Sequence, residues 1–491
     1  MVSGGCPICL VGDMRPISDK IFVNGELRAA YSDKRIIVDN PALGERLGTI
    51  PDCSTKDVDD AVEAADRAFI EWSEKSNRDR AGILYRLASL LRDNIEAFSG
   101  LDTEDSGRTL RETQAQVSRS AEQLEYCAGI ADKLEGRVIP IGGSYTGMTV
   151  LEPYGVIGAL TPWNAPLLQV AQKVSHILAA GNTVVVKPSP LACFTTLHFA
   201  ILAQEAGLPN GVLNIVTGGR GTGEAVVADN RVQKITFTGS IATGRAIASE
   251  CGKRGASVSL ELGGKCPLVI FADSDLPTAV EGAAQAAYGT TGQSCVSAAR
   301  ILVEESIFDE FVQRFSKTIE EYRSADPLDQ NSTMGPMISR ESRTRVVSLV
   351  EDALLNGARI AGGVWPQQLN ETGGYFMQPV ALVDVPDCAK IVHDEIFGPV
   401  TCLERFIEED DALSKANFGP YGLAAGIFTS NSSRARRMQK RIKAGNVWIN
   451  CYKMLDPALP FGGDKSSGIA RECGVDGILN FVKPKTIVEA F

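Results

Sequence analysis

The alternation of short apolar segments with helical patterns between residues 154 and 262 most constrains the fold of this chain. The expected strands are residues 156–160, 183–187, 212–216 and 234–237. Helical patterns at residues 167–180 and 195–205 separate the first three of them. Such alternation predicts a mostly parallel sheet with helices on both faces. Residues 263–465 repeat the theme, beginning with a strand at 267–271 and a helix at 276–288, so we expect an α/β protein.

The flanking regions show other patterns. An Asn24-Gly25 turn separates two short strands within residues 21–27. Apolar residues at three- and four-residue spacing predict a helix at 57–72, and further helices are expected at 78–98 and 111–133. Residues 136–153 are strand-like around a turn at 142–144, which indicates a hairpin projecting from the body, and residues 486–490 form a last strand.

Length and charge limit the class of protein. A chain of 491 residues with 44% hydrophobic content is expected to form two or three domains. It has no apolar run near 18 residues, and its first residues lack the basic and apolar regions of a secretory signal. The net charge of −11 disfavours non-specific binding to nucleic acid or to an acidic membrane.

Cysteine and histidine usage bears on compartment and metals. Twelve cysteines are scattered along the chain, which favours reduced thiols and a cytoplasmic location. Cys6 and Cys9 form the one C-x-x-C pair, but no second pair completes a zinc site, so we expect a non-functional tail. Only three histidines are present, and no metal site is expected.

Three side chains in separate segments carry complementary chemistry. Cys295 follows a Gly-Gln-Ser sequence, Glu261 precedes Leu-Gly-Gly-Lys, and Asn164 ends a Pro-Trp-Asn sequence. A thiol can add to a carbonyl carbon, an amide can hold the resulting oxyanion, and a carboxylate can activate water. Together they are suited to covalent oxidation of a carbonyl compound.

Two features indicate where an anionic cofactor would bind. Gly239 and Ser240 follow an expected strand and open a helix, where backbone amides and the helix dipole favour negative charge. Lys187 ends another strand, and ligands of open α/β sheets gather at that edge. Taken alone, a plain strand-to-helix turn explains the glycine segment at least as well, and a solvated lysine is the better explanation of Lys187.

The chain resembles the NAD(P)-dependent aldehyde dehydrogenase superfamily over essentially its whole length. Seven motifs occur in the order typical of that superfamily. They are TPWN (161–164), VKPS (186–189), FTGS (237–240), LELGGK (260–265), GQSC (292–295), EIFGP (395–399) and PFGG (460–463).

The resemblance implies a role for each matched catalytic position. Cys295 would be the nucleophile and Glu261 the general base. Asn164, with the backbone N–H of Cys295, would form the oxyanion hole.

The resemblance also implies the cofactor contacts. Lys187 would hold the adenosine ribose, and Gly239 and Ser240 would lie beside the pyrophosphate. Glu395 would bind the nicotinamide ribose, with Phe397 packed nearby. Trp163 is expected on the same cofactor side.

The superfamily's architecture implies three parts. Residues 1–134 and 154–262 would form a Rossmann-type cofactor domain, and residues 263–465 an α/β catalytic domain. Residues 135–153 and 476–491 would form a small β oligomerisation element, giving a homodimer or a homotetramer.

One departure concerns the cofactor. Relatives that prefer NAD often carry a glutamate three residues after the ribose lysine, and this chain has Pro190 there. NAD is the first expectation, and NADP is compatible with the charge at this position.

The substrate pocket is expected around Ala165, Gln169, Ser294 and Val296, with Gln172 on the same helix as Gln169. These side chains indicate a roomy and partly polar tunnel, and hence a medium-sized polar or aromatic aldehyde. Lys453 and Arg471 are candidate anion contacts, although solvated surface is the commoner position for such residues.

Two other functions compete with oxidation to the acid. A CoA-acylating dehydrogenase would pass the acyl group to a thiol rather than to water, and retention of Glu261 favours water. A non-enzymatic binding or structural protein on the same fold is disfavoured because Cys295 and Glu261 are both present.

Overall fold

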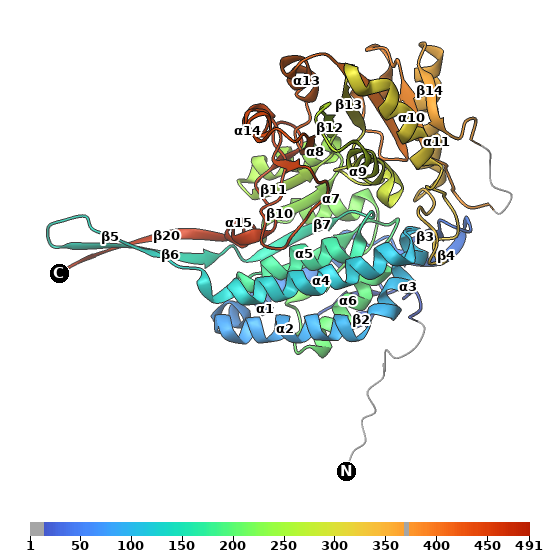
Figure 1. The fold of residues 1–491 in the computed structure, drawn as a ribbon. Helices are drawn as coiled ribbons and strands as arrows, with labels where there is room; N and C mark the ends of the chain where they lie inside the picture. Colours follow the sequence, from blue (N-terminus) through green and yellow to red (C-terminus); the bar gives the residue numbers. More distant parts are fainter. Residues whose placement is uncertain (1–13, 368–372) are drawn as a thin grey trace.

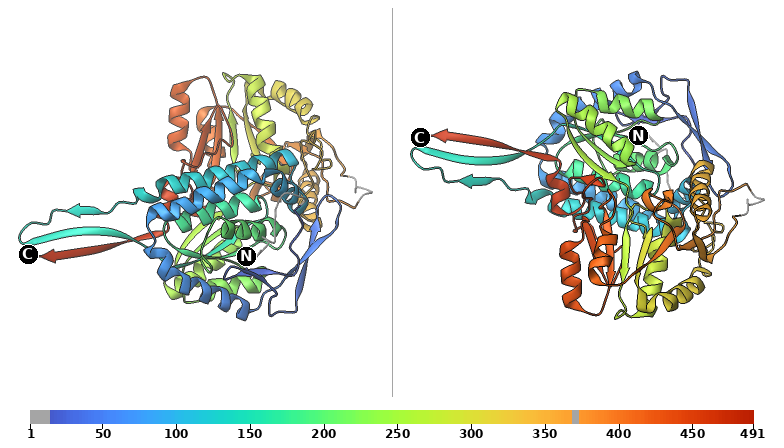
Figure 2. Two further views of the ribbon diagram at one scale, coloured as in Figure 1. Left: turned by 90° about the horizontal axis from the view of Figure 1, so that it is seen from below. Right: turned by 90° about the horizontal axis from the view of Figure 1, so that it is seen from above.

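Two sheet-centred bodies and a long projecting arm make up the molecule (Figures 1 and 2). The computed structural model describes residues 14–367 and 373–491. Cys6 and Cys9 therefore lie outside the described residues.

The first body is built on an eight-stranded sheet with the order β19-β11-β10-β7-β8-β9-β1-β2. Its central strands are parallel, as the alternation in the sequence predicts. These are β7 (Val156–Thr161), β8 (Thr183–Pro188), β9 (Leu213–Ile215), β10 (Val232–Gly239) and β11 (Ser257–Leu262). The antiparallel strands at its edges are β1 (Ile21–Val23), β2 (Glu26–Arg28) and β19 (Gly468–Ile469).

Helices cover both faces of this sheet, and the alternation of side chains along β8 shows why. Val184 and Val186 point into one apolar core, whereas Val185 points into the other. Each fully buried valine of this kind contributes roughly 1.5–3 kcal/mol to folding. The helices around the sheet are α1 (Thr55–Glu74), α2 (Asn77–Asp93), α3 (Ile95–Ser106), α4 (Leu110–Ile130), α5 (Pro166–Ala179), α6 (Phe194–Glu205), α7 (Arg220–Ala228) and α8 (Ile241–Arg254).

The helix expected at residues 78–98 is divided in two, so that prediction was wrong as a single element. Helix α2 ends and α3 begins at Asn94. The Asn94 side chain donates to the Leu90 carbonyl at 2.8 Å and its backbone N–H to Leu91. Asparagine competes with the helix for backbone hydrogen bonds in this way, and the apolar spacing continues past it.

The second body contains a seven-stranded sheet with the order β14-β15-β16-β13-β12-β17-β18. All neighbouring strands are parallel except β14 at the edge. Its strands are β12 (Pro267–Ile270), β13 (Arg300–Glu304), β14 (Arg359–Gly363), β15 (Val380–Val383), β16 (Val400–Phe406), β17 (Ala424–Phe428) and β18 (Asn446–Ile449). Its helices are α9 (Leu276–Tyr288), α10 (Phe308–Ile319), α11 (Arg340–Leu355), α12 (Lys390–His393), α13 (Glu409–Ala416) and α14 (Ser432–Arg441).

A three-stranded sheet forms the arm that extends from the first body (Figure 2). It contains β5 (Arg137–Ile139), β6 (Tyr145–Pro153) and β20 (Val482–Ala490), and short α15 (Gly474–Leu479) precedes β20. The turn before β6 uses Gly142 and Gly143, both at positive φ, which confirms the expected hairpin. A separate ribbon pairs β3 (Arg35–Asn40) with β4 (Glu45–Pro51).

The division into cofactor, catalytic and oligomerisation parts stays a prediction. The first sheet is formed by residues 21–262 together with the edge strand β19, and the second by residues 267–449. None of the described helices is long and apolar enough to cross a membrane.

We expect the arm to hold copies of the chain together. Its two outer strands expose unpaired backbone groups and apolar side chains, including Val138, Val488 and Phe491, which are 77%, 60% and 80% exposed. Deleting residues 484–491 should lower the molar mass measured by light scattering. Circular dichroism should show that the two bodies stay folded, because these residues belong to none of the apolar cores. An unchanged mass would assign assembly to another surface.

Candidate active site

A cavity of about 1080 Å³ is lined by segments of both bodies. Every predicted site residue except Lys187 lines it. The residues brought together are Cys295, Glu261, Asn164, Trp163, Gly239, Ser240, Glu395, Phe397, Ala165, Gln169, Ser294 and Val296.

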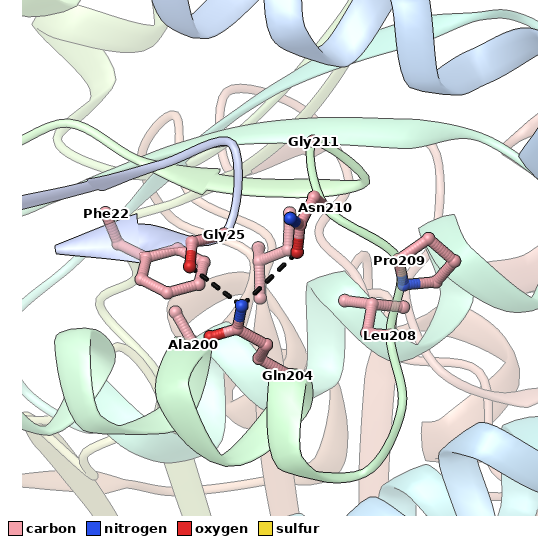
Figure 3. Close-up of a pocket in the computed structure, with 9 residues that line it drawn as sticks. Phe22, Gly25, Ala200, Gln204, Leu208, Pro209, Asn210 and Gly211 are labelled. Carbon is pink, nitrogen blue, oxygen red and sulfur yellow. Dashed lines mark hydrogen bonds between the residues drawn. The ribbon is translucent and has the colours of Figure 1, made fainter. Parts of the chain in front are cut away.

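A second hollow, beside β1 and α6, has a different character (Figure 3). Its volume is about 10 Å³, which admits about one water molecule. The Gln204 amide crosses it and donates to the Gly25 carbonyl at 2.8 Å and to Asn210 Oδ1 at 3.2 Å. The two hydrogen bonds of Gln204 fasten the β1–β2 turn to α6. The hollow is too small to hold a substrate.

The loop that carries Cys295 connects α9 to β13 and has an unusual backbone. Thr290, Thr291 and Gly292 are consecutive residues at positive φ. A Cβ atom at Gly292 would lie 2.1 Å from the Gly398 carbonyl oxygen. The Gly-Gln-Ser-Cys segment therefore packs directly on the Glu-Ile-Phe-Gly-Pro segment, and only glycine allows that contact.

Gln293 fastens the same loop on its other side. Its side-chain amide donates to the Pro336 carbonyl at 3.2 Å and accepts from the Ile338 N–H at 2.9 Å. Both bonds are buried, so they hold the loop in one conformation.

The end of β11 meets both segments. The Gly264 N–H donates to Glu395 Oε1 at 2.9 Å. A Cβ at Gly263 would lie 2.3 Å from Glu395 Oε2, and one at Gly264 would lie 2.5 Å from the Cys295 carbonyl oxygen. The Cys266 thiol donates to that same carbonyl at 3.5 Å. The two glycines thus let three segments converge around Cys295.

Asn164 approaches the cysteine loop from the first body. Its side-chain Nδ2 donates to the Gln293 carbonyl at 3.1 Å. Its own backbone carbonyl accepts from Arg108 Nη1 at 2.5 Å. The arginine, which lies between α3 and α4, thereby positions the asparagine beside the cysteine.

Burial dominates the electrostatics of the carboxylates. Both oxygens of Glu261 are buried and have no hydrogen-bond partner among the described residues. Burial, reinforced by the nearby Glu472 charge, raises the pKa of Glu261 well above its usual range. Burial also raises the pKa of Glu395 to about 7, and this rise is opposed by the hydrogen bond from Gly264.

The surroundings of the partly buried Cys295 thiol favour its protonated form. Burial raises the pKa of this thiol above the usual range, and the neighbouring Cys266, Glu395 and Glu261 act in the same direction. Lys453 acts in the opposite direction. The thiol therefore needs a base to accept its proton before it can act as a nucleophile.

The edge of the first sheet offers a site for a dinucleotide. Gly239 ends β10, and the Ser240 side chain caps α8 by accepting from the Thr243 N–H at 3.3 Å. The N-terminus of this 14-residue helix lies at the cavity wall. Trp163 and Phe397 meet edge to face across the cavity, with ring centroids 5.4 Å apart. These residues fit an anionic, planar cofactor.

The structure places Lys187 outside this cavity. It lies near the carboxyl end of β8 and is 8% exposed, and burial lowers its pKa to about 8. A Cβ at Gly223 of α7 would lie 3.9 Å from its Cδ atom. Lys187 therefore lies between β8 and α7, further along the strand ends than the other cofactor residues.

Comparison with known proteins identifies the family. The sequence pattern of the "Aldehyde dehydrogenase family" matches residues 28–487. The chain is 39% identical over 497 residues to human aldehyde dehydrogenase 1A1, which covers 99% of this chain and 98% of the relative. It is also 39% identical over 478 residues to the (Z)-2-((N-methylformamido)methylene)-5-hydroxybutyrolactone dehydrogenase of Acinetobacter baylyi, which covers 95% and 96%.

A solved structure gives the same result. The NAD+ complex of an aldehyde dehydrogenase from Bacillus cereus superposes with a TM-score of 0.94 at 35% identity, covering 96% of this chain and 97% of that one. The chain belongs to the aldehyde dehydrogenase family. It is an NAD(P)-dependent aldehyde dehydrogenase, and the resemblance seen in the seven motifs is confirmed.

The sequence reasoning missed a buried ion pair in this aldehyde dehydrogenase. Lys173 of α5 forms a salt bridge with Glu472, and the side chains are 0% and 6% exposed. Glu472 Oε2 also accepts from the Gln172 amide at 2.9 Å. The Gln172 amide is therefore already hydrogen-bonded to Glu472. Lys173 and Glu472 are nearly 300 positions apart, so no local sequence pattern predicts their contact. A lysine within a helical pattern is usually solvated, which makes burial of Lys173 unexpected.

The two candidate anion contacts have different environments. Arg471 is engaged by Asp464 Oδ1 at 2.6 Å and by the Gly463 carbonyl at 3.1 Å. Lys453 lines the cavity of the aldehyde dehydrogenase. Cys193, Cys266 and Cys402 are buried free thiols, whereas Cys451 is exposed at the cavity.

Gly292→Ala tests the packing of the cysteine loop. A Cβ at positive φ, 2.1 Å from a backbone oxygen, should cost at least ~1–3 kcal/mol and shift the loop. We expect a lower denaturant midpoint and slower alkylation of Cys295 by iodoacetamide. Gly252→Ala is the matched control, because Gly252 lies in α8 with no atom within 4 Å of an added Cβ. Equal behaviour of the two variants would contradict the packing argument.

Proposed function

We propose that this aldehyde dehydrogenase oxidises its substrate through a covalent intermediate on Cys295, with Glu261 as general base and Asn164 as oxyanion donor. The observation that carries the proposal is the Asn164 Nδ2 bond to the Gln293 carbonyl. This bond places an amide donor beside the loop of Cys295, in the cavity that Glu261 also lines. An amide nitrogen has two hydrogens, so one remains for an oxyanion.

The reaction then runs in two stages. Cys295 Sγ adds to the aldehyde carbon, and its proton passes to a base. The Asn164 amide and the Cys295 N–H donate to the oxyanion that forms. Bound NAD(P)+ supplies the acceptor for the hydride that leaves this carbon. A thioester remains on Cys295, and water hydrolyses it to the carboxylic acid while Glu261 accepts a proton.

The buried carboxyl of Glu261 suits that role. Because its pKa is raised, its ionised form is a stronger base than an exposed glutamate. Its two oxygens have no hydrogen-bond partner among the described residues, so both can accept from water or from the thiol.

The cofactor contacts in the proposal are Trp163, Gly239, Ser240, Glu395, Phe397 and Lys187. Glu395 would accept from ribose hydroxyls, and the N-terminus of α8 beside Ser240 would favour the pyrophosphate. Lys187, beyond the cavity, would meet the adenosine ribose. NAD is the proposed first choice, and NADP is compatible with Pro190.

The proposed substrate is a medium-sized polar or aromatic aldehyde. A volume of about 1080 Å³ exceeds the usual ligand pocket of roughly 300–1,000 Å³, which leaves room for a dinucleotide and a substrate together. The small Ala165 and the polar Ser294 and Gln169 line it, with Val296 beside them. Hydrolysis is proposed over transfer to CoA because Glu261 is retained. A panel of aldehydes with NAD+ and NADP+, followed by reduced-nicotinamide absorbance, tests the substrate and the cofactor.

Asn164→Ala removes the proposed oxyanion donor. One such donor typically contributes ~3–4 kcal/mol, so turnover should fall by about two to three orders of magnitude. Turnover of Asn164→Asp, which keeps the shape of the side chain but loses the donor, should fall by a similar factor. Circular dichroism should show that both variants fold. Near-normal turnover in either variant would refute the role.

Glu261→Gln separates the two stages and tests their pH dependence. Only the ionised carboxylate accepts a proton, and burial raises its pKa, so hydrolysis in the parent enzyme should accelerate with rising pH above the range in which an ordinary glutamate titrates. Glu261→Gln should release about one reduced nicotinamide per site in a stopped-flow burst and then stall at every pH. Rapid steady turnover of this variant would exclude Glu261 as the base, and turnover that requires CoA would favour acyl transfer.

A further inference from the structure

Lys453 is a buried cation in the substrate cavity without an anionic partner. It follows β18 in the loop that closes one side of the cavity. Its Nζ atom is shielded from solvent and has no hydrogen-bond partner among the described residues. Burial lowers its pKa to about 8. An ammonium in such a place is costly unless something pairs with it.

The surrounding loop holds this side chain in position. The Trp448 Nε1–H donates to the Met454 carbonyl at 2.9 Å, directly after Lys453. The Tyr452 ring, directly before it, packs against Trp448 with centroids 4.9 Å apart. Lys453 itself has a φ of 55°, a left-handed conformation that bends the chain there. Tyr452 and Met454 are both held by contacts with Trp448. The backbone of Lys453 is therefore fixed from both sides.

The ammonium lies beside the loop that carries the catalytic cysteine. A Cβ at Gly289, at the end of α9, would lie 4.0 Å from Lys453 Nζ. Glu112 is the carboxylate with the largest electrostatic effect on Lys453, but it accepts from the Thr290 N–H at 2.7 Å and the Thr109 N–H at 3.3 Å. Among the described residues, no carboxylate forms an ion pair with Lys453 within 4.0 Å.

The arginines that line the same cavity either have hydrogen-bond acceptors or are exposed to water. Arg108 donates to the Asn164 carbonyl, and Arg345 donates to the Glu395 carbonyl at 3.0 Å. Arg119 is exposed at the rim and therefore hydrated. Lys453 thus differs from these arginines: its Nζ atom is buried, its side chain lines the cavity, and none of its hydrogens has an acceptor among the described residues.

We propose that Lys453 Nζ binds a carboxylate at the far end of the substrate, so that the preferred aldehydes are ω-oxo carboxylates. The inference rests on the proposed function, because the aldehyde end must reach Cys295. One ammonium matches one carboxylate, whereas the adjacent Glu112 charge disfavours a dianionic phosphate. Lys453 would act on specificity through this ion pair, and no covalent bond of the reaction would form to it.

The experiment compares ω-oxo acids of increasing length with their methyl esters, which are neutral and nearly the same shape. The parent enzyme should show a kcat/KM for the best acid about ten- to hundredfold above that for its ester, as expected of one charge-assisted hydrogen bond. Lys453→Asn should abolish this preference mainly through KM and leave the ester within about threefold. Asparagine tolerates the left-handed backbone, so this variant should fold.

Two matched variants complete the design. Lys453→Arg keeps the charge and should retain a preference for the acid. Lys443→Gln removes an exposed lysine outside the cavity and should leave both substrates unchanged. The dicarboxylate that corresponds to the best oxo acid should inhibit the parent enzyme competitively against the aldehyde, and this inhibition should be lost in Lys453→Asn.

Other outcomes would overturn the inference. Equal losses for acid and ester in Lys453→Asn, with alkylation of Cys295 by iodoacetamide shifted to higher pH, would show that Lys453 tunes the thiol instead. Efficient oxidation of esters without preference for acids would refute carboxylate binding and leave the proposed function standing. Failure of the parent enzyme to oxidise either series through Cys295 would refute both.

Discussion

The hydrogen bond from the Gly264 N–H to the Glu395 carboxylate is the contact on which the site depends. It joins the end of β11 to the segment before β16, and the cysteine loop lies across both. None of the three segments could approach so closely with ordinary side chains, since a Cβ at Gly263, Gly264 or Gly292 would overlap a neighbouring oxygen. The geometry of this part of the cavity is therefore built from backbone packing, and it positions the side chains to which we assign the chemistry.

This packing sets the electrostatics. Convergence of the segments buries Glu261 and partly buries Glu395 and Cys295, and this burial raises the pKa of each. A buried carboxyl and a buried thiol both favour their protonated forms, so the carboxylate, once ionised, is a stronger base than an exposed glutamate. Lys453 is the counterpart with opposite sign, because the same loss of water disfavours its charge until an anion arrives.

Much of the fold followed from local patterns. Strands β1, β2 and β7 to β10 of the first sheet, the Asn24-Gly25 turn and the glycine turn of the arm were predicted because each depends on a few adjacent residues. Strands β11 and β19 were not among the predicted elements. The break at Asn94 was missed because apolar spacing continues across it, although the asparagine itself was a usable signal. The cavity residues Cys295, Glu261 and Asn164 were singled out because motifs carried them, whereas Glu472 and Arg108 make contacts with partners distant in the chain.

By itself, the sequence determined the α/β class, the family and the residue types available for chemistry, because these depend on short-range periodicity and contiguous motifs. Tertiary structure alone decided which charges are buried and which are paired. It separated Lys187 from the main cavity, engaged Arg471 with Asp464 and left Lys453 without a partner. The physical reason is that desolvation and pairing are properties of the space around a group, and segments far apart along the chain create that space.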